Sequence, residues 1–184
     1  MSKVVLITGA SSGIGKSVAT FLQDKGCKVY GTSRNPKNIK DFTFELIALD
    51  VLKLDTINNA INYIIQKEGR LDILVNNAAL YGSLSTGRFD KLDENDWNDC
   101  MDVNVNGIWR CSKAVINSMK ENKSGSIINI SSLAALAGLP YALHYSTSKA
   151  AVIGMTRAMA RELGKDWIRV NAVGPSAVLT EGTK

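Results

Sequence analysis

The sequence has few cysteines, a single histidine and no long apolar run. Its three cysteines are Cys27, Cys100 and Cys111, and they form no Cys-x-x-Cys pair. We therefore expect reduced thiols rather than a disulfide framework. With His144 as the only histidine, we predict no multi-histidine metal site and no bound metal. The apolar stretches are much shorter than the roughly 20 residues that span a bilayer.

The N-terminus also lacks a targeting pattern. Met1, Ser2 and Lys3 lead directly into a strand-like run, and we recognise no secretory signal with a cleavage site. We therefore expect a cytoplasmic protein with no membrane partner.

The composition of the chain is that of a globular protein. Of its 184 residues, 45% are hydrophobic and 21% are charged, which excludes a wholly disordered chain. This length fits one domain whose core needs no disulfide or metal for stability. The net charge is +5, but the basic residues are scattered among acidic ones. We therefore predict no nucleic-acid partner, and instead a solvated basic surface or a site for a phosphorylated ligand.

Short β-branched runs alternate with longer helical patterns along the whole chain. The runs are almost continuously apolar, as in strands that are covered on both faces. We expect strands at Val4–Ile7, Lys28–Gly31, Glu45–Leu49, Ile73–Val75, Ser126–Ile130 and Ile168–Ala172, and helices at Gly13–Lys25, Thr56–Lys67, Glu94–Lys120 and His144–Leu163. A further crossover lies near Asn35–Lys40. This alternation predicts an α/β fold with a doubly wound parallel sheet and right-handed crossovers.

A glycine-rich turn follows the first expected strand. Its sequence, TGASSGIG, spans Thr8–Gly15 and opens the first helix. Glycines allow a sharp turn and a close approach of backbone N–H groups to an anion. The N-terminus of the helix adds unpaired donors and a positive dipole end. The turn therefore predicts a pyrophosphate site, although a purely structural turn has the same composition.

Polar residues also follow the second, third and fourth strands. Arg34 lies where an adenosine ribose is expected, and Ser33 before it leaves no carboxylate there. An Arg at this place favours a ribose 2′-phosphate. Asp50 is a candidate acceptor for the adenine amino group, and Asn76–Ala79 supplies small residues that allow close approach. The alternatives are a solvated Arg34 and a loop cap at Asp50.

Three further residues are candidates for proton transfer. Tyr145 and Lys149 are four residues apart, so on a helix they share one face. A nearby ammonium favours the phenolate, so such a pair can exchange protons with an alcohol or carbonyl. Ser132 ends the fifth strand, and its hydroxyl is a candidate to hold the substrate oxygen. A Tyr-x-x-x-Lys pair also occurs for structural reasons alone.

Asn104 is the fourth candidate. It lies inside an expected helix, between Val103 and Val105. Asn is not favoured there by propensity. It therefore requires a polar partner or a functional role.

Together these motifs resemble the compact, single-domain branch of the short-chain dehydrogenase/reductase family. TGASSGIG, NNAA at Asn76–Ala79, Asn104 in VNVNG, Ser132 in NISS and YSTSK at Tyr145–Lys149 match in order and spacing. The resemblance covers essentially the whole chain. It implies a Rossmann fold with strand order 3-2-1-4-5-6 and an NAD(P)-dependent oxidoreductase that acts on CH–OH or C=O groups.

The resemblance also implies a role for each matching residue. Tyr145 would be the general acid or base, and Lys149 would lower its pKa and hold the nicotinamide ribose. Ser132 would position the substrate, and Asn104 would support a water-linked proton relay toward Lys149. The cofactor-binding residues are expected to be Thr8, Gly9, Ser11, Ser12, Gly13, Ile14, Gly15, Arg34, Asp50, Val51, Asn76, Ala78, Tyr145, Lys149, Pro175 and Thr180.

The sequence departs from the family pattern in three places. Ala79 replaces the final glycine of NNAG, and Ser176 replaces the glycine of the Pro-Gly pair. The second change alters the backbone freedom near Thr180, which the resemblance places at the nicotinamide carboxamide. Family members usually continue through a segment that covers the substrate and a seventh strand. We therefore expect residues 1–184 to form one NAD(P)-binding domain that is truncated at its C-terminus.

Arg34 favours NADP(H) as the cofactor, with NAD(H) as the other possibility. The resemblance implies a ketone or secondary alcohol as substrate, of 3-oxoacyl or small carbonyl type. Apolar residues near the expected site suggest an apolar wall that fits a medium-sized apolar ketone. These residues are Leu80, Tyr81, Leu84, Leu136, Leu139 and Tyr141. The alternative is a catalytically silent dinucleotide-binding or scaffold protein with the same fold.

Two helical segments, Trp97–Met119 and His144–Leu163, are apolar on more than one face. A helix of this kind is buried on two sides. We expect a homodimer or homotetramer through these segments, with a larger monomeric core as the alternative.

Overall fold

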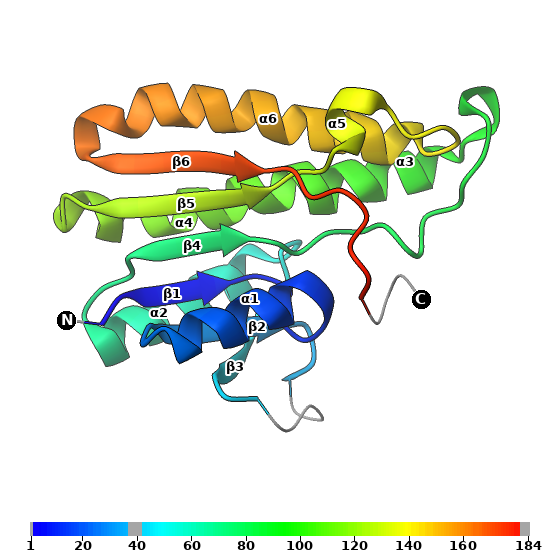
Figure 1. The fold of residues 1–184 in the computed structure, drawn as a ribbon. Helices are drawn as coiled ribbons and strands as arrows, with labels where there is room; N and C mark the ends of the chain where they lie inside the picture. The colour runs from blue at the N-terminus through cyan, green and yellow to red at the C-terminus, as the bar shows by residue number, and fades with distance from the viewer. Residues whose placement is uncertain (1, 37–41, 181–184) are drawn as a thin grey trace.

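The structure is a computed structural model that describes residues 2–36 and 42–180. Its centre is a six-stranded parallel sheet in the order β3-β2-β1-β4-β5-β6 (Figure 1). The strands are β1 Val4–Ile7, β2 Lys28–Ser33, β3 Glu45–Ala48, β4 Ile73–Asn76, β5 Gly125–Ile130 and β6 Ile168–Val173. The predicted doubly wound sheet and its strand order are thus confirmed. Of the crossover near Asn35–Lys40, residues 37–40 lie outside the described residues.

Helices pack on the two faces of this sheet. In Figure 1, α1 lies in front of β1 and β2, and α2 and α4 lie behind the sheet. The longer helices are α1 Gly13–Asp24, α2 Leu54–Glu68, α3 Glu94–Met101, α4 Gly107–Glu121 and α6 Leu143–Leu163. The shorter ones are η2 Phe89–Lys91, α5 Ala134–Ala137 and η4 Gly164–Asp166. None of the helices in the described part of the chain is long and apolar enough to cross a membrane.

Alternate residues of the central strand supply two separate cores. Val4 and Leu6 belong to the cluster that includes side chains of α2 and α4. Val5 and Ile7 belong to the cluster with Ala19 of α1. All four strand residues are buried, which is why this strand is a continuous apolar run in the sequence.

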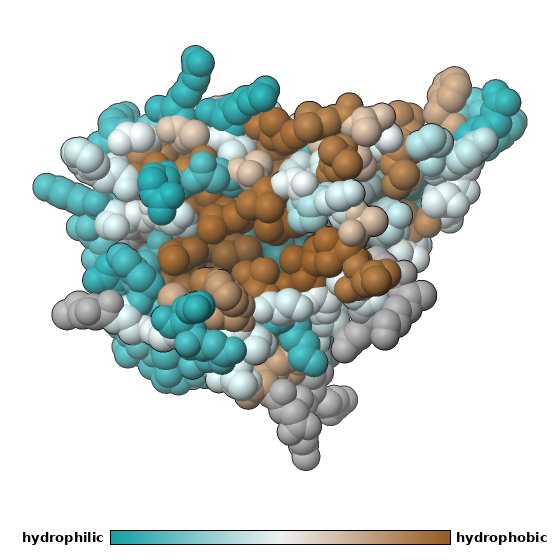
Figure 2. Space-filling view, in the orientation of Figure 1, coloured by the Kyte–Doolittle hydropathy of each residue, from teal (hydrophilic) through white to brown (hydrophobic). Residues whose placement is uncertain are grey.

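The face of the sheet that carries α1 is covered unevenly. Figure 1 shows no described helix in front of β4, β5 and β6, and Figure 2 shows an apolar band across this part of the molecule. Ile73, Ile128 and Ile130 point to this side and are only partly buried. Val173 at the end of β6 is 49% exposed. Apolar surface of the sheet is therefore open to solvent on this side.

The expected helix Glu94–Lys120 contains a wider turn that the sequence did not reveal. Between α3 and α4 lies a π-helical turn, η3, at Asp102–Asn106, closed by a hydrogen bond from the Gly107 N–H to the Asp102 carbonyl. Gly107 packs closely on Val51, since a Cβ on this glycine would lie 3.0 Å from the Val51 Cβ. The wider turn includes Asn104, and π-turns inside helices are frequent at functional sites.

Candidate active site

A cavity of about 1010 Å³ lies at the edge of the sheet where the strands end. Because all six strands are parallel, their carboxyl ends meet at this edge. The cavity is lined by the segments that follow the strands and by the start of α6, namely Gly9–Gly15 in part, Thr32–Arg34, Leu49–Leu52, Asn77–Tyr81, Ile130–Ala134, Tyr145, Lys149 and Pro175–Thr180. Residues that are distant in the sequence thus share one site.

The glycine-rich turn is shaped by close contacts that exclude side chains. Gly9 has φ +65°, and a Cβ there would lie 2.9 Å from the Ala78 Cα. A Cβ on Gly15 would lie 2.3 Å from the Gly9 carbonyl oxygen. These two positions therefore require glycine, and the turn packs directly on the segment after β4.

The start of α1 is open toward an anion. Ser12 is the N-cap residue, but its side chain makes no capping hydrogen bond, and the first turn of the helix contains no acidic residue. Ser12, Ile14 and Gly15 line the cavity. The backbone N–H groups at this helix start fit a phosphate group, which the helix dipole also favours.

Thr8 and Asn77 join the end of β1 to the end of β4. The Thr8 hydroxyl accepts hydrogen bonds from the N–H groups of Asn77 and Ala78, both at 3.0 Å. The Asn77 side chain donates to the carbonyl oxygens of Thr8 and Gly9, both at 2.9 Å. Thr8 is 1% exposed and is not among the described residues that line the cavity. It therefore holds the glycine turn against the segment after β4.

The structure places Asn77, and not the predicted Asn76, at the cavity. The Asn76 side chain is 2% exposed and donates to Asn129 Oδ1 at 2.9 Å and to Ser112 Oγ at 3.1 Å. It lies in a polar network inside the protein, away from the cavity. Asn77, which we did not single out, lines the cavity. Its signal was its position as the first residue past the strand, where a side chain is free to face the edge of the sheet.

At the end of the cavity formed by the segments after β2 and β3, Arg34 and Asp50 lie in different surroundings. The Arg34 side chain is exposed and lines the cavity, and within the described residues it forms no ion pair. Asp50 Oδ1 accepts a hydrogen bond from the Leu52 N–H at 3.0 Å, so this carboxylate does cap a turn. Asp50 and Val51 both line the cavity as well. The capping role and the cavity position coexist at Asp50.

At the other end, Tyr145 and Lys149 lie one turn apart in α6. Lys149 is 2% exposed, its ammonium lies 5.6 Å from the centre of the Tyr145 ring, and it donates to the Ile130 carbonyl oxygen at 2.8 Å. Burial lowers the pKa of Lys149 to about 8. The lysine is thus fixed between α6 and the end of β5.

The pKa of Tyr145 moves in the direction opposite to the expected one. Burial raises the pKa of this phenol, and a hydrogen bond with Ser132 offsets part of the rise. Burial is the largest cause of this shift, and the Lys149 ammonium donates its hydrogen bond to the Ile130 carbonyl oxygen. Tyr145, Ser132 and Lys149 nevertheless line the same cavity.

Asn104 has the polar partners that its mid-helix position required. Its Oδ1 accepts from the Leu80 N–H at 2.7 Å, and its Nδ2 donates to the Leu80 carbonyl oxygen at 3.1 Å. Nδ2 also lies 3.1 Å from Ser148 Oγ, and the Ser148 hydroxyl donates to the Tyr145 carbonyl oxygen at 2.8 Å. Asn104 is fully buried and is not among the described residues that line the cavity. It connects the segment after β4 to the helix that carries Tyr145.

The C-terminal segment closes one side of the cavity. Pro175 and Thr180 line it, and Thr180 lies beside Gly13, where a Cβ would be 3.7 Å from the Thr180 Cβ. Gly13 itself, with φ +54°, is not among the described residues that line this cavity. Its role is in the turn.

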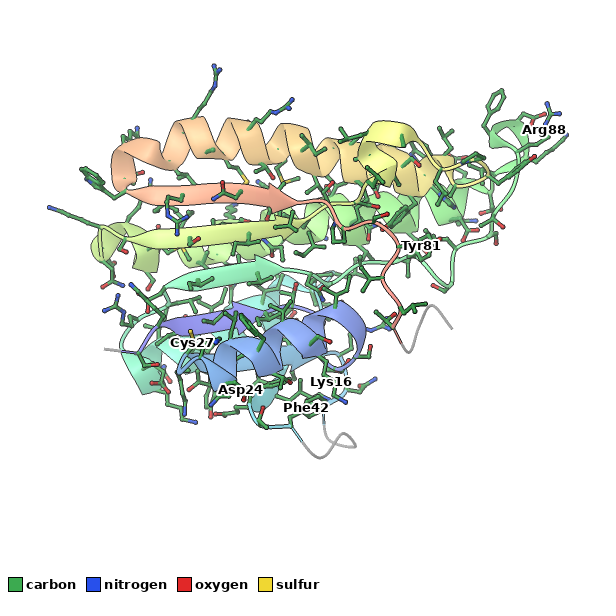
Figure 3. All side chains as sticks on the ribbon, in the orientation of Figure 1. Lys16, Asp24, Cys27, Phe42, Tyr81 and Arg88 are labelled. Carbon is green, nitrogen blue, oxygen red and sulfur yellow. The ribbon has the colours of Figure 1, made fainter. Side chains whose placement is uncertain are left out.

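Part of the expected apolar wall is present. Leu80, Tyr81 and Leu139 line the cavity, together with Leu133, Ala134 and Ala137 at α5; Figure 3 shows Tyr81 beyond the end of β4. Leu136 is 78% exposed, Tyr141 is 64% exposed and Leu84 is buried, and these three are absent from the described lining. Residues 2–36 and 42–180 contain no group of three His, Cys, Asp or Glu side chains arranged to hold a metal ion.

Comparisons with known proteins agree with this geometry. The sequence model of a family described as short chain dehydrogenase matches residues 3–184. A 3-oxoacyl-[acyl-carrier-protein] reductase of Vibrio cholerae is 37% identical over 99% of this chain and 76% of the relative. A reductase of the same name from Thermotoga maritima is 36% identical, with the same coverage of both chains.

Solved structures show the same likeness. ElxO with NADP bound has a TM-score of 0.91 and 38% identity, over 100% of this chain and 77% of that chain. A 3-ketoacyl-(acyl-carrier-protein) reductase of Brucella melitensis complexed with NADH has a TM-score of 0.90 and 30% identity, over 98% and 78%.

Proposed function

The chain belongs to the short-chain dehydrogenase/reductase family of oxidoreductases, and from this premise we propose that it is an NADPH-preferring enzyme that interconverts ketones and secondary alcohols. One observation carries the proposal. A single cavity joins the glycine turn and the open start of α1 to Tyr145, Lys149 and Ser132. A dinucleotide phosphate site and a proton-transfer group are therefore within reach of one bound cofactor.

The residues of the cavity fit a dinucleotide. The N–H groups at the start of α1 would hold the pyrophosphate, and Asp50 and Val51 lie at the adenosine end. Arg34 would contact a ribose 2′-phosphate, which supports a preference for NADPH. Among the structural relatives, one has NADP bound and another has NADH. When bound, the nicotinamide cofactor would supply or accept the hydride.

In the direction of reduction, Tyr145 would act as the general acid. Its hydroxyl would donate a proton to the carbonyl oxygen, and Ser132 would hold this oxygen by a hydrogen bond. The phenolate that remains would be stabilised by the nearby Lys149 cation. In the direction of oxidation, Tyr145 would accept the proton of the alcohol. Asn104 would act through its contacts with Leu80 and Ser148.

The shape of the cavity and the relatives support a carbonyl substrate with an apolar substituent. The relatives from Vibrio cholerae and Thermotoga maritima are reductases of 3-oxoacyl groups. Leu133, Leu139 and Tyr81 form an apolar wall of the cavity that Tyr145 also lines. A 3-oxoacyl or small ketone substrate is consistent with this wall.

We also propose that copies of the chain associate through the α3–α4 and α6 segments. Trp109 of α4 is 52% exposed. Trp97, Met101, Ile153 and Met155 of the same segments are only partly buried. Apolar surface of this kind on neighbouring helices is typical of an interface between subunits.

Replacing Tyr145 by Phe tests the proposed enzyme. Tyr145→Phe removes the proton donor but keeps the ring, so we expect cofactor affinity to stay within about twofold and turnover to fall by about 10²–10⁴-fold. The measurement is NADPH oxidation with a panel of ketones, together with a fluorescence titration of NADPH binding.

The matched control is Tyr141→Phe, because Tyr141 is exposed and does not line the cavity. Turnover that survives in Tyr145→Phe would exclude the proposed role of Tyr145. Cofactor binding by the unmodified chain without turnover of any ketone would favour the catalytically silent alternative.

A further inference from the structure

Tyr81 covers the ring of the proposed acid. Its ring centre lies 4.6 Å from that of Tyr145, with the two planes inclined by 52°. Tyr81 is 48% exposed, and both tyrosines line the cavity. A carbonyl that reaches the Tyr145 hydroxyl must therefore pass beside the Tyr81 ring.

The backbone that carries Tyr81 is fixed on one side by Asn104. Both backbone polar groups of Leu80 bond to the Asn104 amide, at 2.7 and 3.1 Å. The turn that begins at Tyr81 is closed by a hydrogen bond from the Leu84 N–H to the Tyr81 carbonyl oxygen at 3.1 Å. Tyr81 thus extends from a turn whose start cannot shift without breaking the two hydrogen bonds to Asn104.

The end of the same turn is fixed by His144, the residue before Tyr145. His144 is fully buried, and its Nε2 lies 3.2 Å from the Ser85 carbonyl oxygen. Its Nδ1 accepts a hydrogen bond from the Tyr145 N–H at 2.8 Å. Nε2 is therefore the nitrogen that carries the hydrogen and donates to Ser85. The turn of Tyr81 and the start of the helix of Tyr145 are held together by this one ring.

Aliphatic side chains line the same cavity as Tyr81 and Tyr145. Leu133, Ala134, Ala137, Gly138 and Leu139 line this end of the cavity. The charged side chains in the described lining are Arg34, Asp50 and Lys149, and the first two belong to the adenosine end. A substituent that enters beside Tyr81 therefore meets an aromatic ring and aliphatic side chains in one cavity.

We propose that Tyr81 determines the substrate specificity of this enzyme by selecting carbonyl compounds that carry a flat, apolar substituent. Its ring packs on the ring of Tyr145, and Leu133 and Leu139 line the same cavity. An aromatic substituent beside Tyr81 would stack or pack edge-on against it. A polyol or a charged substituent would give up hydration against the aliphatic side chains. This inference rests on the proposed function and adds the substrate class and the residue that selects it.

The test compares two methyl ketones that differ in one substituent. Reduction of acetophenone and of butanone by NADPH is measured for the unmodified chain, Tyr81→Ala and Tyr81→Phe. Tyr81→Ala is expected to lower kcat/KM for acetophenone by about 10–100-fold and for butanone by less than about threefold. Tyr81→Phe keeps the ring and is expected to keep the preference.

Phe89→Ala is the matched control. Phe89 is an exposed aromatic residue of the same connection and is not part of the described lining; its removal is expected to leave both substrates unaffected. Thermal unfolding of each variant confirms that it is folded. If Tyr81→Ala leaves kcat/KM unchanged for both ketones, or lowers it equally for both, the inference is overturned. An unmodified chain that binds NADPH but reduces neither ketone would instead overturn the proposed function on which the inference rests.

Discussion

Burial governs the chemistry of Lys149. Its side chain has lost almost all contact with water, and its ammonium donates to the backbone carbonyl of Ile130. A cation in this place has given up hydration without gaining a carboxylate partner, so its pKa falls from 10.5 to about 8. The residue is therefore suited to a bound ligand that supplies polar partners. Without one, its charge opposes folding.

This gives a prediction for Lys149→Met in the absence of cofactor. At about pH 7 both folded and unfolded chains are protonated at Lys149, and the cost of the buried charge is fully present. A fall of the pKa from 10.5 to about 8 corresponds to roughly 3 kcal/mol, so the variant is expected to be more stable by up to this amount. As the pH rises above about 8, the folded chain loses the proton that the unfolded chain retains, and the difference shrinks.

The measurement is the free energy of unfolding in urea for both proteins, from about pH 7 to about pH 9.5. Only the difference between them is informative, because burial raises the pKa of Cys100 and Cys111 in both. These thiols make each protein less stable as the pH rises. The subtraction removes the contribution of Cys111, whereas Cys100 interacts with Lys149 and contributes to the difference. A difference that does not change with pH would contradict the prediction.

Arg34 belongs to the same scale, because the proposed cofactor preference rests on this one side chain. Arg34→Asp replaces a cation at the adenosine end of the cavity by a carboxylate, which repels a 2′-phosphate and accepts from a 2′-hydroxyl. A charge-assisted contact contributes about 1.5–3 kcal/mol, so the preference for NADPH over NADH is expected to fall by about 10–150-fold.

Dissociation constants of NADPH and NADH from fluorescence titrations test this. Lys165→Asp is the control, because it makes the same change of charge at an exposed position in η4, beyond the far end of α6. If the unmodified chain binds NADPH and NADH equally, Arg34 does not distinguish the cofactor that carries a 2′-phosphate from the one that lacks it.

At the scale of the elements, the π-turn η3 sets the direction of one side chain. It lies between α3 and α4 and points Asn104 toward the backbone of Leu80, a residue 24 positions earlier in the chain. The sequence predicted that a polar group in this apolar helix needs a partner. It could not name the partner, because the contact depends on how the helix packs against the connection after β4.

Asn104→Ala is expected to lower the free energy of unfolding by about 1–3 kcal/mol, because it leaves partly buried backbone groups of Leu80 without partners. Urea denaturation measures this loss. The dependence of the unfolding free energy on urea concentration should be the same in the variant and the unmodified chain. Asn106→Ala is the control in the same turn, since the Asn106 side chain is exposed and donates a hydrogen bond to Asp102 Oδ1. Equal losses in the two variants would show that the Leu80 contacts contribute nothing particular.

At the scale of the whole molecule, the strand order creates the site. β1 and β4 are neighbours although the chain passes through β2 and β3 between them. This adjacency places the glycine turn beside Asn77 and Ala78, and β5 and β6 bring Ser132 and the C-terminal segment to the same edge. The two faces of the sheet differ, since helices cover one face throughout and α1 covers only part of the other (Figure 1). The apolar band in Figure 2 is the result.

The sequence by itself determined how strands and the longer helices alternate along the chain. It also determined the glycine turn and placed Tyr145 and Lys149 on one side of a helix. These features follow from local periodicity and backbone conformation, which neighbouring residues specify. The tertiary structure alone decided that Asn76 lies in the interior and Asn77 at the cavity, and that Lys149 faces Ile130. It also placed Tyr81 against Tyr145. These outcomes depend on the register between strands and on the packing of segments that are distant in the sequence, and no local pattern encodes such contacts.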